Sequence, residues 1–591
     1  MKKIVSTLAI AGACLALTSC DDLFEPAQEN NLGLEYMYNN PSYAEGILAN
    51  AYTRIPIGSY PWSEVATDDA VSNDADNSWR RLAAGTWRAD NNPTERWQNC
   101  RAAIQYLNLF LANAEKVAWN TNETLNKMYC DREMGEAYAL RAMYMYYLLE
   151  AHAGYTADGE LLGVPIVTEP ETQASNFNAP RNTFAECVDA MRADAAKALE
   201  LLPLQYGKTD EMERLHARYP ETNINNVNRV FGTNFVGRID GHIVEAFLAK
   251  LDLMGASPRF ANGSGITWED AAKSAATVIN RVGGVQGVDP TGYTWYCNVD
   301  DIENLRMADL PLEVLWAGER GKGNGTESEN YPPTLYGNGR INPSQNFVDA
   351  FPMANGYPIT DSRSGYSKND PYSGRDPRLA TYVLYNGSQA GLTNTTINTA
   401  ANGSTNDALN KVNGKSTRTG YYLKKLMRQD ISLDPSAKTE QNHYTPRIRY
   451  TEMFLTYAEA ANEAYGPTGK GNQAYSAYDV IKAIRARAGV GAGNDAYLES
   501  IKGDKDKMRE LIRNERRIEL SFEGHRFWDL RRWMAPLNET VTGMSIEAGP
   551  AGVFYEVIDV ENRQYGEHMN YGPIPYSEVL KFSELKQNKG W

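Results

Sequence analysis

The chain has 591 residues, of which 42% are hydrophobic and 23% charged. This composition is typical of a globular protein with a large core and excludes a disordered chain. The formal net charge of -15 argues against a nucleic-acid-binding surface, which needs clustered excess Lys and Arg, and makes polyanions poor candidate ligands. Tyr and Trp are abundant, with 36 Tyr and 11 Trp against 15 Phe. Because each combines a flat apolar ring with a polar group, they suit partly solvated binding surfaces as well as cores.

The N-terminal residues have the pattern of a secretory signal that ends in a cysteine. Lys2 and Lys3 precede an apolar run, 4–17, that is too short to span a bilayer, and Leu-Thr-Ser-Cys then ends at Cys20. This box resembles the bacterial lipoprotein signal, and the acidic residues after it resemble the tag that sends lipoproteins of the Bacteroidetes to the cell surface. We therefore expect a signal peptide over 1–19, lipid on Cys20 as the membrane anchor, and a tether over 20–40. The alternative is an ordinary signal peptide with a chance cysteine.

Four cysteines remain once the signal is removed and Cys20 is lipidated. They are far apart in the sequence and have neither zinc-site spacing nor the pattern of a disulfide framework, so no metal site is predicted. We expect buried apolar residues, although a location in the cell envelope would permit a bridge, and their pairing stays open. They are Cys100, Cys130, Cys187 and Cys297.

Apolar residues recur at helical spacing in four segments, 135–151, 238–254, 450–465 and 474–488. The first carries apolar residues around most of its surface and is expected to be buried on most sides. Such helix pairs approximate the tetratricopeptide period of about 34 residues without its full consensus, and an irregular helical domain is an equal alternative. The sequence thus predicts a mainly α protein.

Between Trp268 and Gln441 the chain is rich in Gly, Asn, Ser and Thr and has few helical stripes. We interpret this stretch as a loop-rich insertion between helices, with a few short strands. The predicted organisation is a helical scaffold over 41–267, the insertion over 268–441, more scaffold over 442–540 and a C-terminal segment over 541–591.

The segment 513–533, RNERRIELSFEGHRFWDLRRW, is the strongest single pattern. It resembles the C-terminal signature of the SusD/RagB family of outer-membrane glycan-binding lipoproteins. Further resemblances follow in the family's order along nearly the whole mature chain, and the main departures are Asn-rich stretches near 223–234 and 393–419. The matching segments are 135–154 with 163–166, 181–203, 342–351, 375–379, 447–463, 484–489, 572–575 and 585–591.

This resemblance implies a tetratricopeptide-like helical scaffold carrying an irregular ligand-binding subdomain, with no catalysis and no cofactor. It also implies a partner, a SusC-like TonB-dependent outer-membrane transporter, over whose extracellular mouth the lipoprotein sits as a lid and passes oligosaccharide inward. For the signature segment and the residues from Met508 that lead into it we expect a structural role: an apolar stripe faces the core, and i,i+3 pairs form ion pairs on the surface. The stripe is Met508, Leu511, Ile512, Ile518 and Phe522, and the pairs are Glu510/Arg513, Arg516/Glu519 and Glu523/Arg526.

A sugar offers an apolar C–H face and a rim of hydroxyls, so its site needs flat aromatic rings beside polar side chains. Two regions have this mixture, and in the family the glycan site draws on an N-terminal loop and the central insertion. For any one of these Trp residues, core packing is an equally good interpretation, and Trp87 and Trp97 are expected in the core. The first region supplies Trp62, Asp68, Asp69, Asn77, Trp79 and Arg81, and the second supplies Trp295, Tyr296, Trp316, Tyr331, Tyr336 and Arg340.

Enzyme motifs are not found. The 6 His form no H-E-x-x-H, and there is no G-x-S-x-G. The phosphate-loop-like Gly414-Lys415-Ser416 lacks its first glycine, because Leu409 stands there, and Trp79 occupies the glycine position of a calcium loop that would begin at Asp74. The sequence therefore predicts a glycan-binding protein that is not an enzyme. The alternatives are a peptide-capturing protein of the same fold and a surface glycoside hydrolase, whose carboxylate pair would leave no sequence trace.

Overall fold

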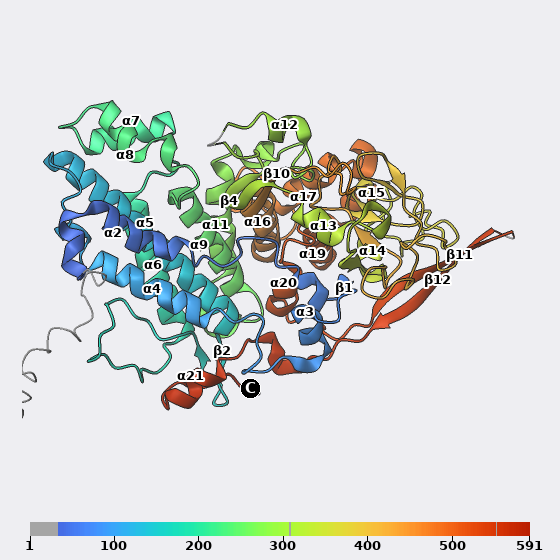
Figure 1. The fold of residues 1–591 in the computed structure, drawn as a ribbon, viewed down its shortest axis with the longest axis horizontal. Coiled ribbons are helices and arrows are strands. Elements are labelled where there is room, and N and C mark those ends of the chain that lie inside the picture. Colours follow the sequence, from blue (N-terminus) through green and yellow to red (C-terminus); the bar gives the residue numbers. More distant parts are fainter. Residues whose placement is uncertain (1–32, 307–308, 551) are drawn as a thin grey trace, which may run out of the picture.

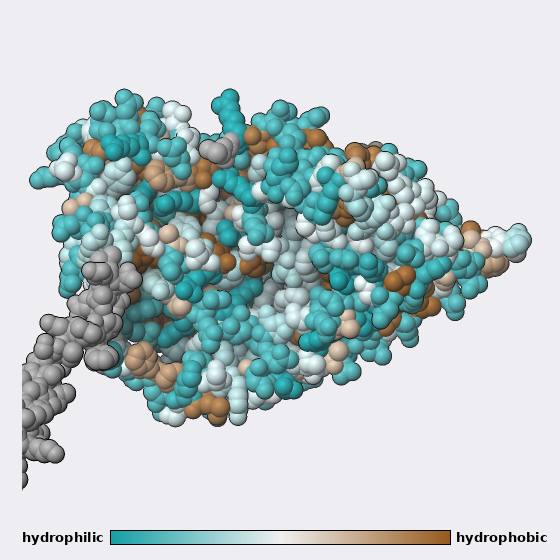
Figure 2. Space-filling model, viewed as in Figure 1, coloured by the Kyte–Doolittle hydropathy of each residue, from teal (hydrophilic) through white to brown (hydrophobic). Residues whose placement is uncertain are grey.

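The computed structural model describes residues 33–306, 309–550 and 552–591 (Figure 1). The predicted signal peptide and Cys20 lie outside the described residues, and the end of the predicted tether forms a short 3-10 helix, Leu34–Asn39. In the part of the chain that is described, no helix combines the length and the apolar character needed to cross a membrane. The face shown in Figure 2 is mostly hydrophilic, with hydrophobic side chains in small separate patches.

The N-terminal part of the scaffold is built around one long buried helix, α5 (Glu123–His152). It contains the predicted segment 135–151 and is flanked by α4 (Trp97–Leu111) and α6 (Phe184–Leu201). Gly135 allows Leu202, at the end of α6, to pack closely against α5, because a Cβ at position 135 would lie 2.8 Å from the Leu202 Cγ atom. Around this group are α2 (Pro41–Tyr52), α7 (Thr209–Arg218), α8 (Ile224–Phe231) and α9 (Gly241–Ala256).

The C-terminal part of the scaffold continues the same core. The predicted helices 450–465 and 474–488 are confirmed as α16 (Tyr450–Tyr465) and α17 (Ala477–Arg487). Helix α11 (Trp268–Asn280) packs against both α9 and α16 and joins the two parts. The boundary predicted at Trp268 is therefore too early, because the Ala-rich face of α11 belongs to the scaffold core. The remaining helices are α18 (Ala496–Ile501), α19 (Lys505–Glu519) and α20 (Arg526–Arg532).

The insertion that follows α11 is rich in loops and has its own core, in which Phe347, Phe351 and Tyr382 are buried. Its longest sheet pairs β4 (Val314–Gly323) with β10 (Gln441–Arg449) in antiparallel register. The remaining strands are short, as predicted. The other elements are α12 (Val299–Glu303), α13 (Gly325–Asn330), β5 (Ile341–Pro343), α14 (Gln345–Ala350), α15 (Pro377–Tyr382), β6 (Val383–Leu384), β7 (Gln389–Ala390), β8 (Thr395–Thr396) and β9 (Tyr422–Leu423).

The C-terminal segment leaves the scaffold as a hairpin of β11 (Val541–Gly549) and β12 (Gly552–Glu561), which projects from the insertion end of the molecule (Figure 1). It then returns to the scaffold as α21 (Tyr576–Lys581). The predicted cysteine burial is confirmed for Cys100, Cys130 and Cys187, while Cys297 is half-buried, and all four are free thiols in this structure.

A buried ionic network surrounds α19. Arg378 of the insertion lies 2.8 Å from Glu515 and 2.9 Å from Glu519, and it also pairs with Asp376. Glu515 further pairs with Arg485, and Glu519 with Arg487, so scaffold and insertion meet at one helix face. Buried charges persist only when they are paired in this way.

The network corrects the prediction of surface ion pairs. The apolar stripe of α19 is buried as predicted, but none of the three i,i+3 pairs forms in the described part of the chain. Arg516 instead pairs with Asp529 at 2.8 Å, and Glu523 with Arg449 at 2.6 Å. The reason is that other elements enclose the charged side of α19, so its carboxylates and guanidiniums meet partners that are distant in the sequence.

Replacing Arg378 should destabilise the fold strongly. Arg378→Met leaves three carboxylates buried without their shared partner, and we expect the free energy of unfolding to fall by about 3–5 kcal/mol in urea denaturation. The matched control is Arg88→Met, because Arg88 and Asp90 form an ion pair that is mostly exposed. Equal stability of the two variants would contradict a structural role for the network.

The network also predicts acid sensitivity. Burial alone would raise the pKa of Glu519, but Arg487, Arg378 and Arg449 lower it from 4.5 to about 2. Because the folded pKa is depressed, this stabilising contribution is complete above about pH 4.5 and is lost as the pH falls toward 2. Burial raises the pKa of Glu64 to about 7, so its cost to stability develops as the pH rises from about 4.5 to 7, is complete above 7 and does not change below about pH 4.5. We expect Tm in calorimetry to fall steeply below about pH 4.5, and a constant Tm down to about pH 3 would contradict this account.

Candidate functional site

The two regions predicted to bind glycan meet in the structure. Strand β1 (Ala70–Ser72) of the first region pairs antiparallel with β5, which directly follows the second, with Ser72 opposite Ile341. Next to this pair, the Asn73 side-chain amide donates to the carbonyls of Asn338 at 3.0 Å and Gly339 at 2.8 Å. The chain after α2 crosses the face of the molecule to reach this point (Figure 1).

Four of the predicted aromatic residues are core residues in this structure. Trp295, Tyr296, Trp316 and Tyr331 have exposed fractions of 2, 6, 1 and 1%. The Trp316 indole N–H donates to the Gly237 carbonyl at 3.1 Å, which satisfies its polar tip inside the protein. In this conformation these rings have no open face for a sugar, so the core-packing interpretation applies to them. Trp87 and Trp97 are buried, as predicted.

The two predicted acidic residues, Asp68 and Asp69, are also buried and connect the N-terminal region to the signature segment. Asp68 lies 2.8 Å from Arg517 and 2.9 Å from Arg526, and Asp69 lies 2.6 Å from Arg517. Burial alone would raise the pKa of Asp68, but the two guanidiniums hold it well below its usual range. Asp68 is thus an ionised partner in a structural ion pair.

The other predicted residues remain accessible. Tyr336 is 59% exposed, and Trp62 is half-buried beside Tyr60, with ring centroids 5.4 Å apart. The Arg340 Nη1 group donates to the Gly414 carbonyl at 3.0 Å. Asn77 caps α3 (Ser78–Arg81), and the Arg81 side chain pairs with Asp76 on the surface.

An open groove of about 560 Å³ lies between the loop after α2, the loop before α4, and α20. Two half-buried indoles line it, Trp79 from α3 and Trp528 from α20. Neither indole N–H donates a hydrogen bond within the described residues, and neither is shut away from solvent. The remaining lining is Thr53, Arg54, Ile55, Pro56, Ile57, Gly58, Ser59, Pro61, Pro93, Thr94, Glu95, Arg96 and Asn99.

Local contacts hold both indoles in place. The Trp79 ring lies edge-on to Phe527, with centroids 5.2 Å apart, and Phe527 also contacts the Trp528 ring at 5.1 Å. The Arg96 guanidinium lies 5.3 Å from the Trp528 ring and 2.7 Å from Glu150. The groove therefore combines fixed aromatic surfaces with hydroxyl, amide and charged groups, which is the chemistry that a sugar requires.

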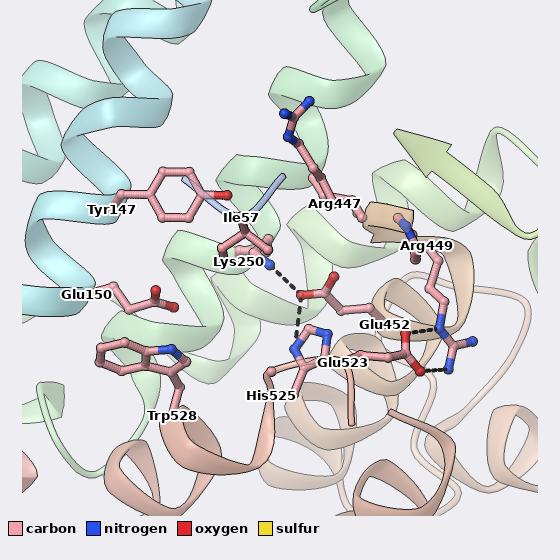
Figure 3. Close-up of a pocket in the computed structure, with 13 residues that line it drawn as sticks. Ile57, Tyr147, Glu150, Lys250, Arg447, Arg449, Glu452, Glu523, His525 and Trp528 are labelled. Carbon is pink, nitrogen blue, oxygen red and sulfur yellow. Dashed lines mark hydrogen bonds and ion pairs between the residues drawn. The ribbon is translucent and has the colours of Figure 1, made fainter. Parts of the chain in front are cut away.

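A small pocket of about 40 Å³ adjoins the groove and shares Ile57 and Trp528 with it (Figure 3). Its charges are mostly paired: Glu452 lies 2.6 Å from Lys250, and Arg449 pairs with Glu523. Burial lowers the pKa of His525 to about 4, so this imidazole is neutral at physiological pH. Among residues 33–306, 309–550 and 552–591, no three His, Cys, Asp or Glu side chains are grouped as metal ligands.

Sequence reasoning missed part of this groove. It did not select Trp528, Arg54, Arg96 or Asn99 as candidate ligand contacts. Five of the seven residues of α20 are buried and they lie all round the helix, so periodicity does not mark Trp528 as exposed. Nothing local indicates that α20 lies beside the loop after α2.

Comparisons with known proteins bear on this fold and site. A family model described as "SusD family" matches residues 312–591, and one described as "Starch-binding associating with outer membrane" matches residues 44–216. Two SusD-like proteins of Formosa agariphila are 30% identical over 154 residues and 28% identical over 170 residues. These alignments cover 26% and 28% of this chain and about a quarter, 26%, of each relative.

Solved structures match over nearly the full length. A SusD-like protein of Bacteroides fragilis is 23% identical with a TM-score of 0.69, and the match covers 94% of this chain and 98% of that one. A SusD-like carbohydrate-binding protein of the same species has a TM-score of 0.66 at 21% identity, covering 93% and 100%. A laminarin-binding SusD-like protein has a TM-score of 0.54 at 18% identity, covering 94% and 100%. At these identities the likeness establishes the fold.

Asp68 provides a test of the structural role assigned above. Asp68→Asn removes the carboxylate nearest to Arg526 and one of the two that pair with Arg517, and we expect the free energy of unfolding to fall by about 3 kcal/mol in urea denaturation. Asp76→Asn, which disrupts the exposed pair with Arg81, is the matched control and should leave stability unchanged. A stable Asp68→Asn variant would return Asp68 to the ligand-binding candidates.

Proposed function

This chain belongs to the SusD/RagB family, and from that premise we propose that it is a non-catalytic glycan-binding protein of the cell surface. In this proposal lipid on Cys20 anchors it in the outer membrane, and it delivers oligosaccharide to a SusC-like TonB-dependent transporter. The family description "associating with outer membrane" and the signal-like N-terminus support the location. The carbohydrate- and laminarin-binding neighbours support the ligand class.

One observation carries the assignment to the groove. Trp79 and Trp528 line the same open groove, their indole N–H groups are free of internal partners among the described residues, and hydroxyl and amide groups surround them. An indole face covers the apolar side of a pyranose, while Ser59, Asn99 and the indole N–H groups reach its hydroxyls. Open sites of this kind bind weakly, at roughly micromolar to millimolar Kd, or about -8 to -4 kcal/mol.

The groove lining argues against hydrolysis. Glycoside hydrolases use a pair of carboxyl groups placed on either side of the scissile bond. Among the residues that line the groove, Glu95 alone carries a carboxylate, and its Oε1 accepts the backbone N–H of Gln98 at 3.0 Å. We therefore rank the hypothesis of a surface glycoside hydrolase below that of a glycan-binding protein. The other alternative is a peptide ligand. A peptide-capturing protein would bind peptides and would not bind polysaccharides.

The groove assignment predicts which aromatic residues matter. Trp79→Ala and Trp528→Ala should each weaken polysaccharide binding by ten- to a hundredfold, because each removes about 1.5–3 kcal/mol of buried aromatic contact. The measurement is affinity electrophoresis of the chain from residue 21 through gels containing a panel of polysaccharides, laminarin included, with released reducing ends assayed in parallel.

Tyr336→Ala is the matched control, since Tyr336 is an exposed aromatic residue that does not line the groove. It should bind like the unchanged protein. Loss of binding in Tyr336→Ala with no effect of Trp79→Ala would move the site to the insertion surface. Release of reducing ends would establish an enzyme instead.

A further inference from the structure

We propose that the groove selects glycans that carry sparse acidic groups, and that Arg54 is the residue that contacts the acid. The shared chemistry is an oxyanion with two adjacent acceptor oxygens, whether the carboxylate of a uronic acid or a sulfate ester. The inference rests on the proposed function, because it concerns the same groove. It adds a charge preference that shape and aromatic stacking alone do not give.

Arg54 is held in place but not neutralised. It follows the C-terminus of α2, its Nε group donates to the Asn50 Oδ1 atom at 2.9 Å, and its guanidinium lies 5.5 Å from the Tyr106 ring. Within the described residues it forms no ion pair, and its two terminal NH₂ groups make no hydrogen bond and are not closed off from solvent. Its free edge is the planar fork that binds a carboxylate or sulfate through two parallel hydrogen bonds.

The other guanidinium of the groove has a different role. Arg96 pairs with Glu150 at 2.7 Å and lies between the rings of Tyr147 and Trp528, at 4.8 and 5.3 Å. Its charge is thus already compensated, and it supports the Trp528 ring. Glu95 is the one carboxylate in the groove lining, and it forms no ion pair with Arg54. The charge that remains available to a ligand in the groove is therefore that of Arg54.

A second uncompensated guanidinium lies in the adjoining pocket. Arg447 forms no ion pair within the described residues; its Nη1 group donates to the Ala317 carbonyl at 3.2 Å, and it lies 4.8 Å from the Trp316 ring. In Figure 3 its side chain points away from Glu452 and Glu523, two of the three carboxylates that line that pocket, the third being Glu150. The pocket lining carries three cationic side chains, Lys250, Arg447 and Arg449, and three carboxylates, so it brings no net charge to the groove beside it.

The overall charge of the protein limits the kind of acidic glycan. With a net charge of -15, the chain repels a densely charged polymer at long range. At physiological ionic strength such repulsion is screened beyond about 8 Å, so one acid placed against Arg54 is governed by the groove and not by the distant surface. Spaced acidic residues on an otherwise neutral glycan satisfy both conditions.

Two matched pairs of polymers test the preference. The first is glucuronoxylan against its carboxyl-reduced form, and the second is a sparsely sulfated galactan against its desulfated form. In titration calorimetry at about 50 mM salt, we expect the acidic member of at least one pair to bind about tenfold tighter than its neutral counterpart. The difference should shrink at about 500 mM salt. The pair that responds distinguishes carboxylate from sulfate.

The variants are Arg54→Gln, Arg54→Lys and Arg88→Gln, each first shown to be folded by thermal melting. Arg54→Gln should bind the acidic and neutral members equally, and Arg54→Lys should keep part of the preference. Arg88→Gln is the matched control, because Arg88 is exposed and does not line the groove, and it should keep the full preference.

The outcomes separate this inference from the proposed function. If both members of each pair bind equally to the unchanged protein, or if Arg54→Gln keeps the preference, the role of Arg54 is overturned, while weaker binding by Trp79→Ala still supports the groove as a glycan site. If no polysaccharide binds at all, the proposed function fails, and the charge preference fails with it.

Discussion

The charged face of α19 is the constraint on which the rest of the structure depends. Glu515 and Glu519 bind Arg378 of the insertion, and the neighbouring Arg517 binds Asp68 of the segment that follows α2. Unpaired charges in this interior would be strongly unfavourable. The scaffold, the insertion and the N-terminal segment are therefore held in the one arrangement in which each buried charge has its ion-pair partner. The ion pairs thus specify how scaffold, insertion and N-terminal segment fit together, while apolar burial supplies most of the stability.

That arrangement in turn builds the groove. Helix α20 is fixed by the Arg516–Asp529 pair, and the Glu64 side chain accepts the backbone N–H of Gly524 at 2.8 Å, which joins the loop before α20 to the N-terminal segment. Trp79 and Trp528 therefore sit on elements that are held from both sides. A ligand that contacts them does not have to order the protein first, which favours affinity in a small open site.

The sequence predicted the main helices, the loop-rich character of the insertion and the family, because hydrophobic periodicity and motif order are local signals. It did not predict the partners of Glu519 or Arg516, since a charged stripe has the same sequence pattern whether water or another element covers it. Trp295 and Trp79 likewise stand in similar polar contexts, and only the packing of distant segments decides that the first is buried. For the same reason, no local sequence pattern indicates that Arg54 and α20 line one groove.

Most of the buried tryptophans donate their indole N–H groups inside the protein, Trp97 and Trp295 being the exceptions among the described residues, whereas the two tryptophans of the groove do not. Trp87, Trp316 and Trp533 are buried and donate inside the protein, to Asn92, the Gly237 carbonyl and Glu459. Within the described residues Trp79 and Trp528 have no such acceptor, so water satisfies their N–H groups in the free protein. A buried donor without a partner is costly, whereas one at an open groove loses little when a sugar hydroxyl replaces water. At Trp79 and Trp528, unlike at the buried Trp295, the unpartnered N–H faces an open groove, where a sugar hydroxyl can take the place of water.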